Sequence, residues 1–435
     1  MKFGTDGLRG VAGTELTAEL ALALGRAAAR ILGGPRFVVG RDTRESGPWL
    51  EAAFAAGVAA EGIDVELLGV LPTPGVAWLA AEAGVPAAMI SASHNPYHDN
   101  GIKLFGAGGR KLSDEVEARL EADLLAASTP IEPIGRITHG EDDGRERYLR
   151  HLVDSVGGRP LGLSVVIDCA NGAASVTAAD ALRRLGCQVD VLHASPDGRN
   201  INDGCGSTHP EALRARVVEL GADLGLAFDG DADRVLAVDR AGRVIDGDHL
   251  IALFAIDLEE RGALRDDAVV VTVMTNLGFR IAMRERGIRV LETKVGDRYV
   301  LEALEAEQLT IGGEQSGHVI FREIASTGDG VLTGIQLLDL VQRRGRPLAE
   351  LADEAMTSLP QVLRNVRVER RGVDVSAAIA GDIASVESDL GEHGRVLIRP
   401  SGTEPLVRVM VEAPTAELAE AAAARLVAAV ERAAT

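Results

Sequence analysis

An apolar run that opens into a tight acidic loop, LGLAFDGDADR at residues 224–234, carries the main signal for the fold. The run has the length and composition of a buried strand, and the loop sets Asp229, Asp231 and Asp233 at alternate positions. Ligands in open α/β sheets bind outside the carboxyl ends of the strands. We therefore expect this loop to lie at a binding site.

The same order of elements occurs three times along the chain, as a weak internal repeat. Each copy reads as β-α-β-α-β and ends in an unusual polar loop, at residues 91–96, 229–234 and 312–318. Apolar runs that alternate with amphipathic helices predict parallel or mixed sheets with right-handed crossovers. The last segment reads instead as β-α-β-β-α, with its first helix expected over residues 376–390, which is typical of a small α+β domain.

These patterns predict an α/β fold with three tandem related β-α-β-α-β domains, whose mixed sheets lie between helices, and a C-terminal α+β domain. A chain of 435 residues is too long for one compact core, which agrees with several domains. The expected domains are residues 1–150, 151–250, 251–360 and 361–435.

The composition excludes several classes of protein. A formal net charge of −20 is unlike the basic surface that a nucleic-acid binder needs. The cysteines Cys169, Cys187 and Cys205 are odd in number and form no CxxC pair, which argues against a disulfide framework and a structural zinc site. Apolar stretches are too short for a signal peptide or a membrane span. We expect a cytoplasmic protein that binds neither nucleic acid nor membrane.

The acidic loop is a candidate metal site. Neighbouring carboxylates repel one another unless a cation lies among them, and oxygen ligands favour Mg²⁺ or Ca²⁺ over zinc. An EF-hand requires Gly and Glu where this loop has Arg234 and Arg240. The alternative, a solvated acidic turn, is disfavoured by the apolar flanks Phe228 and Val235. Arg234 beside the loop suits an anionic ligand.

Ser93 lies in SASHNP, residues 91–96, at another strand end. A serine hydrolase is disfavoured because the G-x-S-x-G elbow is missing and the adjacent His94 is poorly placed as the base of a triad. A serine directed at a divalent cation indicates phosphoryl transfer instead. Taken alone, the motif is equally consistent with an Asn-Pro turn. Lys103 and Arg9 are either surface cations or groups that stabilise a transferring phosphate.

Two further loops carry candidate binding residues. RPSGTEP, residues 399–405, joins two strands and can direct N–H groups, hydroxyls and the Arg399 guanidinium at a phosphate, with Arg408 in the next strand. GEQSGH, residues 313–318, offers a carboxylate, a hydroxyl and an imidazole to sugar hydroxyls or to an amine. The alternatives are a plain hairpin turn for the first loop and a structural role for His318.

Together, SASHNP, DGDADR, GEQSGH and RPSGTEP resemble, in this order, the four loops of the α-D-phosphohexomutase superfamily, over essentially the whole chain. The resemblance implies four domains around one central cleft, which contribute a phosphoserine, a metal loop, a sugar-binding loop and a phosphate-binding loop. FGTDGLRG (residues 3–10), Gln315 and TKVGDRY (residues 293–299) are similar to the branch that acts on glucosamine phosphates. A phosphoglucomutase or phosphomannomutase is the alternative within the superfamily.

The resemblance implies an isomerase that interconverts glucosamine 6-phosphate and glucosamine 1-phosphate for amino-sugar nucleotide and peptidoglycan synthesis. The reaction would use phosphate carried on Ser93, one Mg²⁺ per chain, and glucosamine 1,6-bisphosphate as intermediate and activator. The implied catalytic residues are Ser93, Arg9, Lys103, His94 and His318, and the implied metal ligands are Ser93, Asp229, Asp231 and Asp233. The implied substrate-binding residues are Arg234, Glu314, Ser316, Arg399, Ser401, Gly402, Thr403 and Arg408.

The residues present also bear on two other possible functions. A metal-dependent sugar phosphatase with an aspartate nucleophile in the acidic loop would release free phosphate and would not need Ser93. A sugar-phosphate sensor without activity is disfavoured because Ser93, the acidic loop and Lys103 are all present. The partner is expected to be a small phosphosugar. A homodimer is left open, as is the first phosphorylation of Ser93, by an unknown kinase or by autophosphorylation.

Overall fold

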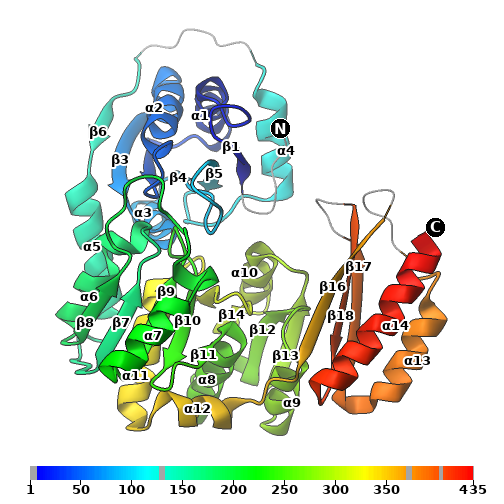
Figure 1. Ribbon diagram of the computed structural model, residues 1–435. Coiled ribbons are helices and arrows are strands. Elements are labelled where there is room, and N and C mark those ends of the chain that lie inside the picture. Colours follow the sequence, from blue (N-terminus) through cyan, green and yellow to red (C-terminus); the bar gives the residue numbers. More distant parts are fainter. Residues whose placement is uncertain (1–6, 127–132, 369–374, 401–404, 435) are drawn as a thin grey trace. The chain divides into compact units, whose positions relative to one another are not determined.

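The computed structural model describes residues 7–126, 133–368, 375–400 and 405–434 (Figure 1). The chain forms two compact units, residues 1–273 with 289–353, and residues 274–288 with 354–435. The described residues form three sheets in the first unit and one in the second. Within these ranges, every helix is too short or too polar to span a bilayer.

The first sheet has six strands in the order β1-β5-β4-β2-β3-β6. The pairs β1–β5 and β4–β5 are antiparallel and the others are parallel. One apolar core joins this sheet to α1, α2 and α4, with Phe37, Phe54 and Leu120 fully buried. The strands are β1 (Leu8–Val11), β2 (Arg36–Arg41), β3 (Asp64–Val70), β4 (Ala87–Ile90), β5 (Asp99–Phe105) and β6 (Ile137–His139). The helices are α1 (Ala18–Leu32), α2 (Gly47–Ala60), α3 (Thr73–Ala83), α4 (Asp114–Asp123) and α5 (Glu141–Asp154).

The second sheet has the order β11-β10-β9-β7-β8, with β9, β7 and β8 parallel. Strand β9 is the apolar run before the acidic loop, and all of its residues are buried, as expected for a strand covered on both faces. The strands are β7 (Ser164–Asp168), β8 (Gln188–Leu192), β9 (Leu224–Phe228), β10 (Val235–Asp239) and β11 (Val244–Ile245). The helices are α6 (Ala178–Arg184), α7 (Glu211–Leu220) and the short 3₁₀ turns η1 (Ala173–Val176) and η2 (Gly206–Thr208).

The third sheet has the order β13-β12-β14-β15. Its strands are β12 (Ala268–Thr272), β13 (Arg289–Thr293), β14 (Ile311–Gly313) and β15 (Val319–Phe321). The helices that follow the second sheet along the chain are α8 (Gly247–Glu260), η3 (Arg265–Asp267), α10 (Asp297–Ala306), α11 (Gly330–Arg344) and α12 (Leu348–Ala355). Asp329 is the N-cap of helix α11, and its side chain accepts the Leu332 N–H.

The second unit holds a three-stranded antiparallel sheet in the order β16-β18-β17. Helices α13 and α14 pack against this sheet and against each other, as Figure 1 shows in orange and red. The elements are α9 (Leu277–Glu285), β16 (Gln361–Arg367), α13 (Ala380–Leu390), η4 (Gly391–His393), β17 (Arg395–Pro400), β18 (Leu406–Glu412) and α14 (Ala416–Ala434).

The predicted fold class is confirmed: mixed sheets with helices precede a small α+β sheet. One boundary differs, because the sequence predicts a helix over residues 376–390 and α13 begins only at Ala380. The N–H groups of Ala378 and Ile379 both turn back to the Val375 carbonyl, so the chain makes a turn before the helix starts. The first sheet also gains β1, β5 and β6, which lie outside the repeat.

Candidate active site

Ser93 lies three residues beyond β4, in a turn that holds its backbone in the left-handed region at φ 52°. Such a conformation is strained for a non-glycine residue and is found where a structure over-determines a functional turn. The hydroxyl Oγ donates to Asp229 Oδ2 at 2.6 Å and lies 3.2 Å from His94 Nδ1. The turn therefore directs the serine at the acidic loop of the neighbouring sheet.

Arg44, which is not among the site residues expected from the sequence, holds the backbone of this turn in place. Its fully buried guanidinium pairs with the equally buried Asp42 at 2.8 Å. It donates to the carbonyls of Ser93 at 2.9 Å and Asn95 at 2.8 Å. Ser91 completes the cradle, because its Oγ accepts the Ser93 N–H and donates to Asp42. The backbone around the serine is thus fixed by a charged, fork-shaped donor.

The three aspartates of the acidic loop, Asp229, Asp231 and Asp233, are all buried, and a carboxylate oxygen from each lies within 4.8 Å of the others. Among the described residues, Asp231 Oδ1 and Asp233 Oδ1 are buried without a hydrogen-bond partner. Buried carboxylate oxygens need a donor or a cation. An all-oxygen set in which two atoms accept no hydrogen bond therefore fits a hard divalent cation such as Mg²⁺.

Lys103 is the buried cation beside these carboxylates and is only 2% exposed. Its Nζ lies 2.8 Å from Asp231 Oδ2 and 3.6 Å from Asp233 Oδ2. Burial raises the pKa of Asp229, and the charges of Asp233 and Asp231 raise it further. Although burial opposes it, the charge of Lys103 and the hydrogen bond from His318 hold the pKa of Asp233 below its usual range. The loop is therefore short of positive charge around Asp229, next to Ser93.

The serine turn and the acidic loop approach each other closely at Gly230, and neighbouring side chains hold both in place. A Cβ on Gly230 would lie 2.6 Å from the Ser93 carbonyl oxygen and 2.8 Å from Asn202 Nδ2. Asn202 Nδ2 itself donates to the Ser93 carbonyl at 2.9 Å. On the other side of the loop, Thr73 Oγ1 donates to Asp231 Oδ2 at 2.5 Å. Gly230 is therefore required here by the close approach of backbone to backbone.

His94 is a neutral ring at the serine. Burial lowers its pKa to about 4, and the charges of Arg234 and Arg9 act in the same direction. Arg234 Nη1 donates to His94 Nδ1 at 3.1 Å, which places the ring proton on the other nitrogen. The Arg234 backbone N–H also donates to Asp229 Oδ1. The His94 ring and the Arg234 backbone thus both adjoin the Ser93–Asp229 contact.

A cavity of about 210 Å³ lies against the acidic loop and brings several of the candidate residues together. Its lining includes Arg9, Asp233, Arg234, Asp297, Glu314 and His318. Glu314 Oε1 accepts the Gly296 N–H at 3.0 Å, while Ser316 is exposed beside it. A cavity that presents guanidinium groups and carboxylates together suits a ligand that carries both phosphate and polar hydroxyl or ammonium groups.

His318 is fully enclosed between the carboxylates of Asp233 and Asp297, at 3.8 and 3.6 Å. Burial lowers its pKa, but these carboxylates outweigh burial and raise it. The Gly328 N–H points at Nε2 from 2.9 Å, and a backbone donor pairs only with an unprotonated nitrogen. We therefore assign the proton to Nδ1, which faces Asp233. His318 thus contacts the acidic loop through the Asp233 carboxylate.

The candidate phosphate-binding residues lie in the second unit. Arg399 and Arg408 are direct partners across β17 and β18. Burial lowers the pKa of Arg399, and the charge of Arg408 lowers it further. Like charges at directly opposite positions destabilise a sheet, so this pair favours an anion above it. Ser401, Gly402 and Thr403 lie outside the described residues.

The family of the chain follows from comparison with known proteins. Four models of phosphoglucomutase/phosphomannomutase match: α/β/α domain I over residues 1–130, α/β/α domain II over 146–242, α/β/α domain III over 246–359 and the C-terminal domain over 363–429. The chain belongs to the phosphoglucomutase/phosphomannomutase family, and it is an enzyme, a phosphosugar mutase.

Particular relatives narrow this class. The chain is 55% identical to the phosphoglucosamine mutase of Thermobifida fusca (strain YX), over 98% of this chain and 96% of that one. A phosphoglucomutase/phosphomannomutase family protein of Burkholderia thailandensis is similar in structure, with a TM-score of 0.82, 27% identity, and coverage of 99% and 97%. The Aspergillus fumigatus N-acetylphosphoglucosamine mutase shares the fold, with a TM-score of 0.74, 18% identity, and coverage of 100% and 96%.

Sequence reasoning missed Arg44, Thr73 and Asn202, which position the serine turn and the acidic loop. Arg44 carried a signal, because GRDTRESG (residues 40–47) is a polar turn at the carboxyl end of β2, the same edge of the sheet as Ser93. Thr73 begins a helix and Asn202 lies in a loop, and nothing in their local sequence distinguishes them from capping and turn residues.

Proposed function

We propose that this enzyme interconverts glucosamine 6-phosphate and glucosamine 1-phosphate, with Ser93 as the phosphate carrier. The observation that carries the proposal is the 2.6 Å contact from Ser93 Oγ to Asp229 Oδ2 at a strained turn. The name of the Thermobifida fusca relative supports glucosamine as the sugar. Glu314, half-buried in the cavity, offers a carboxylate to the sugar's ammonium or hydroxyl groups.

The first transfer breaks the bond between phosphorus and Ser93 Oγ and forms a bond between phosphorus and O1 of the sugar. The proton of the sugar hydroxyl ends on Ser93 Oγ, where Asp229 Oδ2 is placed to accept its hydrogen bond. In the second transfer the bond between phosphorus and O6 of the 1,6-bisphosphate breaks, a bond between phosphorus and Ser93 Oγ forms, and the proton of the Ser93 hydroxyl ends on O6 of the sugar. Lys103 and Arg9 stabilise the charge of the transferring group, and His94 adjoins it as a neutral ring.

We propose that Mg²⁺, one per chain, is held by Asp229, Asp231, Asp233 and the phosphorylated Ser93. The two buried carboxylate oxygens of the loop that accept no hydrogen bond, Asp231 Oδ1 and Asp233 Oδ1, support this assignment. When bound, Mg²⁺ would neutralise charge on the transferring phosphoryl group. The Aspergillus fumigatus enzyme was crystallised with GlcNAc-6P and magnesium, and we extend only the metal to this chain.

The remaining binding groups complete the proposal. Arg234, Glu314 and Ser316 would bind the sugar phosphate, and Arg399 and Arg408, with Ser401, Gly402 and Thr403, a phosphate group. The four segments 1–150, 151–250, 251–360 and 361–435 would each contribute one loop. All three cysteines are free thiols, which supports a reducing cytoplasm. Priming by a kinase or by autophosphorylation, and a homodimer, belong to the same proposal.

The decisive experiment compares the purified enzyme with Ser93→Ala, with the exposed-serine variant Ser113→Ala as control. We expect turnover of glucosamine 6-phosphate to be lost in Ser93→Ala alone, and one phosphoryl group to be found by mass spectrometry on the wild-type peptide that contains Ser93. Glucose and mannose 6-phosphates, assayed in parallel, should react more slowly. Release of free phosphate, with full activity in Ser93→Ala, would instead establish a phosphatase.

A further inference from the structure

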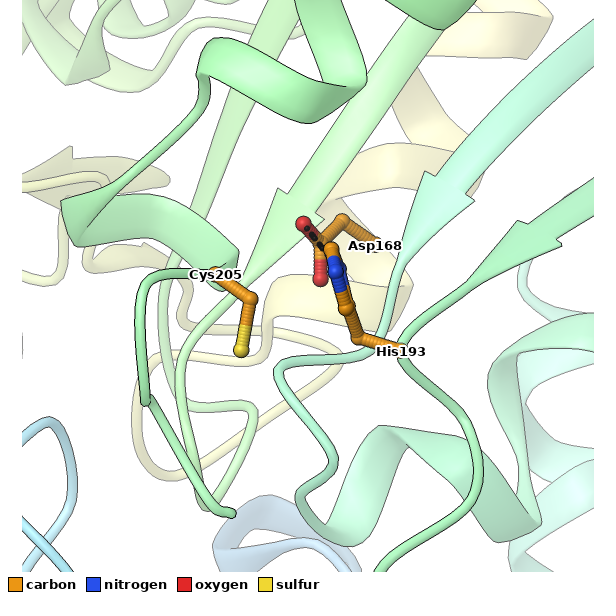
Figure 2. A group of neighbouring side chains, drawn as sticks. All are labelled: Asp168, His193 and Cys205. Carbon is orange, nitrogen blue, oxygen red and sulfur yellow. Dashed lines mark hydrogen bonds and ion pairs between the residues drawn. The ribbon is translucent and has the colours of Figure 1, made fainter.

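A second cluster of potential metal ligands lies away from the acidic loop, in the second sheet. Asp168 ends β7, His193 follows β8 directly, and Cys205 directly precedes η2. Figure 2 shows these side chains converging from a strand end and two separate loops. One ligand atom from each lies within 4.8 Å of the other two. Since the three residues come from different turns, no spacing pattern in the sequence indicates the cluster.

The surrounding structure positions each donor. Asp168 is fully buried; its Oδ1 accepts the Ala170 N–H at 2.9 Å, and its Oδ2 lies 2.9 Å from His193 Nδ1. Cys205 is fully buried, whereas the side chain of His193 is 33% exposed. The backbone of His193 is left-handed at φ 47°. Asp168 and Cys205 therefore form the floor of the cluster, and His193 forms its solvent-facing side.

The donor set distinguishes this cluster from the acidic loop. The acidic loop offers only oxygen, whereas here sulfur, imidazole nitrogen and one carboxylate oxygen meet. Three such protein ligands with one open position are typical of zinc and its neighbours in the transition series. A cysteine nucleophile activated by His193 is disfavoured, because Cys205 has no exposed surface that a substrate could reach.

We propose that Asp168, His193 and Cys205 bind one divalent transition-metal ion of the zinc class, at a site separate from the Mg²⁺ site. The Ala170 N–H fixes the carboxylate, as an outer-shell donor does in known metal sites. A water molecule takes the fourth position on the exposed side of His193. The ion cross-links the end of β7 and two loops, and we expect it to stabilise the folded enzyme.

One residue, Asn202, connects this cluster to the turn of the catalytic serine. The Asn202 N–H donates to the Ala170 carbonyl at 2.9 Å, and Asn202 Nδ2 donates to the Ser93 carbonyl at 2.9 Å. A metal ion bound by Asp168 and Cys205 holds the turn at Ala170, which Asn202 contacts, and the loop that runs from Asn202 to Cys205. The proposal does not depend on the identity of the sugar substrate or on phosphate at Ser93.

Cobalt tests the proposal directly, because thiolate bound to Co²⁺ gives a charge-transfer absorption that oxygen ligands do not give. Co²⁺ is titrated into the full-length enzyme in excess Mg²⁺, and Zn²⁺ is then added to displace it. We expect the thiolate band at one equivalent of Co²⁺, its loss on addition of Zn²⁺, and a higher Tm with Zn²⁺. Absence of the band would overturn the proposal.

Variants of the enzyme show which residues bind the Co²⁺ that gives this band. Cys205→Ser should abolish it, while Cys187→Ser, which removes a thiol outside the cluster, should keep it. His193→Asn is a second variant that tolerates the left-handed backbone, and it should weaken Co²⁺ binding at least about tenfold. Asp229→Asn should leave the band intact. A band that survives in Cys205→Ser, or disappears in Asp229→Asn, would place the metal elsewhere and refute the assignment.

Discussion

Lys103 Nζ lies 2.8 Å from Asp231 Oδ2, and both groups are almost fully buried. No such proximity is needed for folding alone, because a buried ion pair contributes little compared with apolar packing. The pair instead compensates one negative charge of a loop that holds three. The lysine and a bound cation therefore share the same task, and their contributions to stability are coupled.

Lys103→Met should destabilise the enzyme by about 3–5 kcal/mol in EDTA, because it leaves buried carboxylates without their cation. The loss should be smaller in Mg²⁺, since the metal supplies the missing charge. Urea unfolding with EDTA and with Mg²⁺ measures both values. The exposed Lys294→Met serves as control and should behave as wild type in both buffers. An equal loss in the two buffers would show that lysine and metal are not coupled.

Arg44→Lys should reduce kcat by about 10- to 100-fold, because a lysine keeps the charge but cannot donate to the carbonyls of Ser93 and Asn95 together. Arg41→Lys is the matched control at the end of β2, three residues before Arg44, where the arginine pairs with Glu51. Steady-state kinetics and thermal unfolding of both variants separate a catalytic effect from a general loss of stability. If both variants lose kcat equally, Arg44 has no special relation to the serine turn.

Gly230→Ala should displace the Ser93 turn, because the new Cβ would lie 2.6 Å from the Ser93 carbonyl oxygen. We expect a stability loss of about 1–3 kcal/mol from overpacking and a much larger relative loss of turnover. Gly381→Ala is the contrasting substitution, since nothing lies within 4 Å of its Cβ and it lies in α13. That variant should be about 0.5–1 kcal/mol more stable and fully active. Wild-type turnover in Gly230→Ala would contradict the proposed contact.

The sequence predicted the parts of the site that depend on strand ends. Ser93, Asp229 and Glu314 each follow an apolar run, and each lies where a strand of its own sheet ends, which is where open α/β sheets bind ligands. The resemblance then supplied the order and the roles of the loops. Both kinds of information are local in the sequence, which is why a single chain was sufficient to predict the fold class.

Other contacts depend on side chains that meet only after folding. Arg44 reaches a carbonyl 49 residues away, and Tyr148 donates to Asp329 across 181 residues. In the sequence, a buried arginine or tyrosine looks the same as an exposed one in a helix or turn. The cluster of Asp168, His193 and Cys205 is hidden for the same reason, because it joins three unrelated turns.

The buried pair of Tyr148 and Asp329 gives the enzyme a testable pH dependence. Burial raises the pKa of Asp329 to about 6, although the Leu332 N–H and the Tyr148 hydroxyl partly oppose the shift. The ordinary value is 3.8, so between pH 4 and 6 the folded state binds more protons at this position than the unfolded state. Asp329 therefore makes the folded state progressively less favourable as pH rises through this window, and its contribution is constant above it.

Asp329→Asn should remove this dependence while keeping the N-cap of α11, since asparagine also accepts the Leu332 N–H. The variant should equal wild type near pH 4 and exceed it near pH 7 by up to about 3 kcal/mol, the equivalent of roughly two pKa units. Urea unfolding of both proteins from pH 4 to 7 measures the difference. Tyr148→Phe, which removes the hydroxyl that partly opposes the shift, should widen the pH window, because the pKa of Asp329 then rises further. A difference between Asp329→Asn and wild type that stays constant across the range would mean that Asp329 does not titrate there.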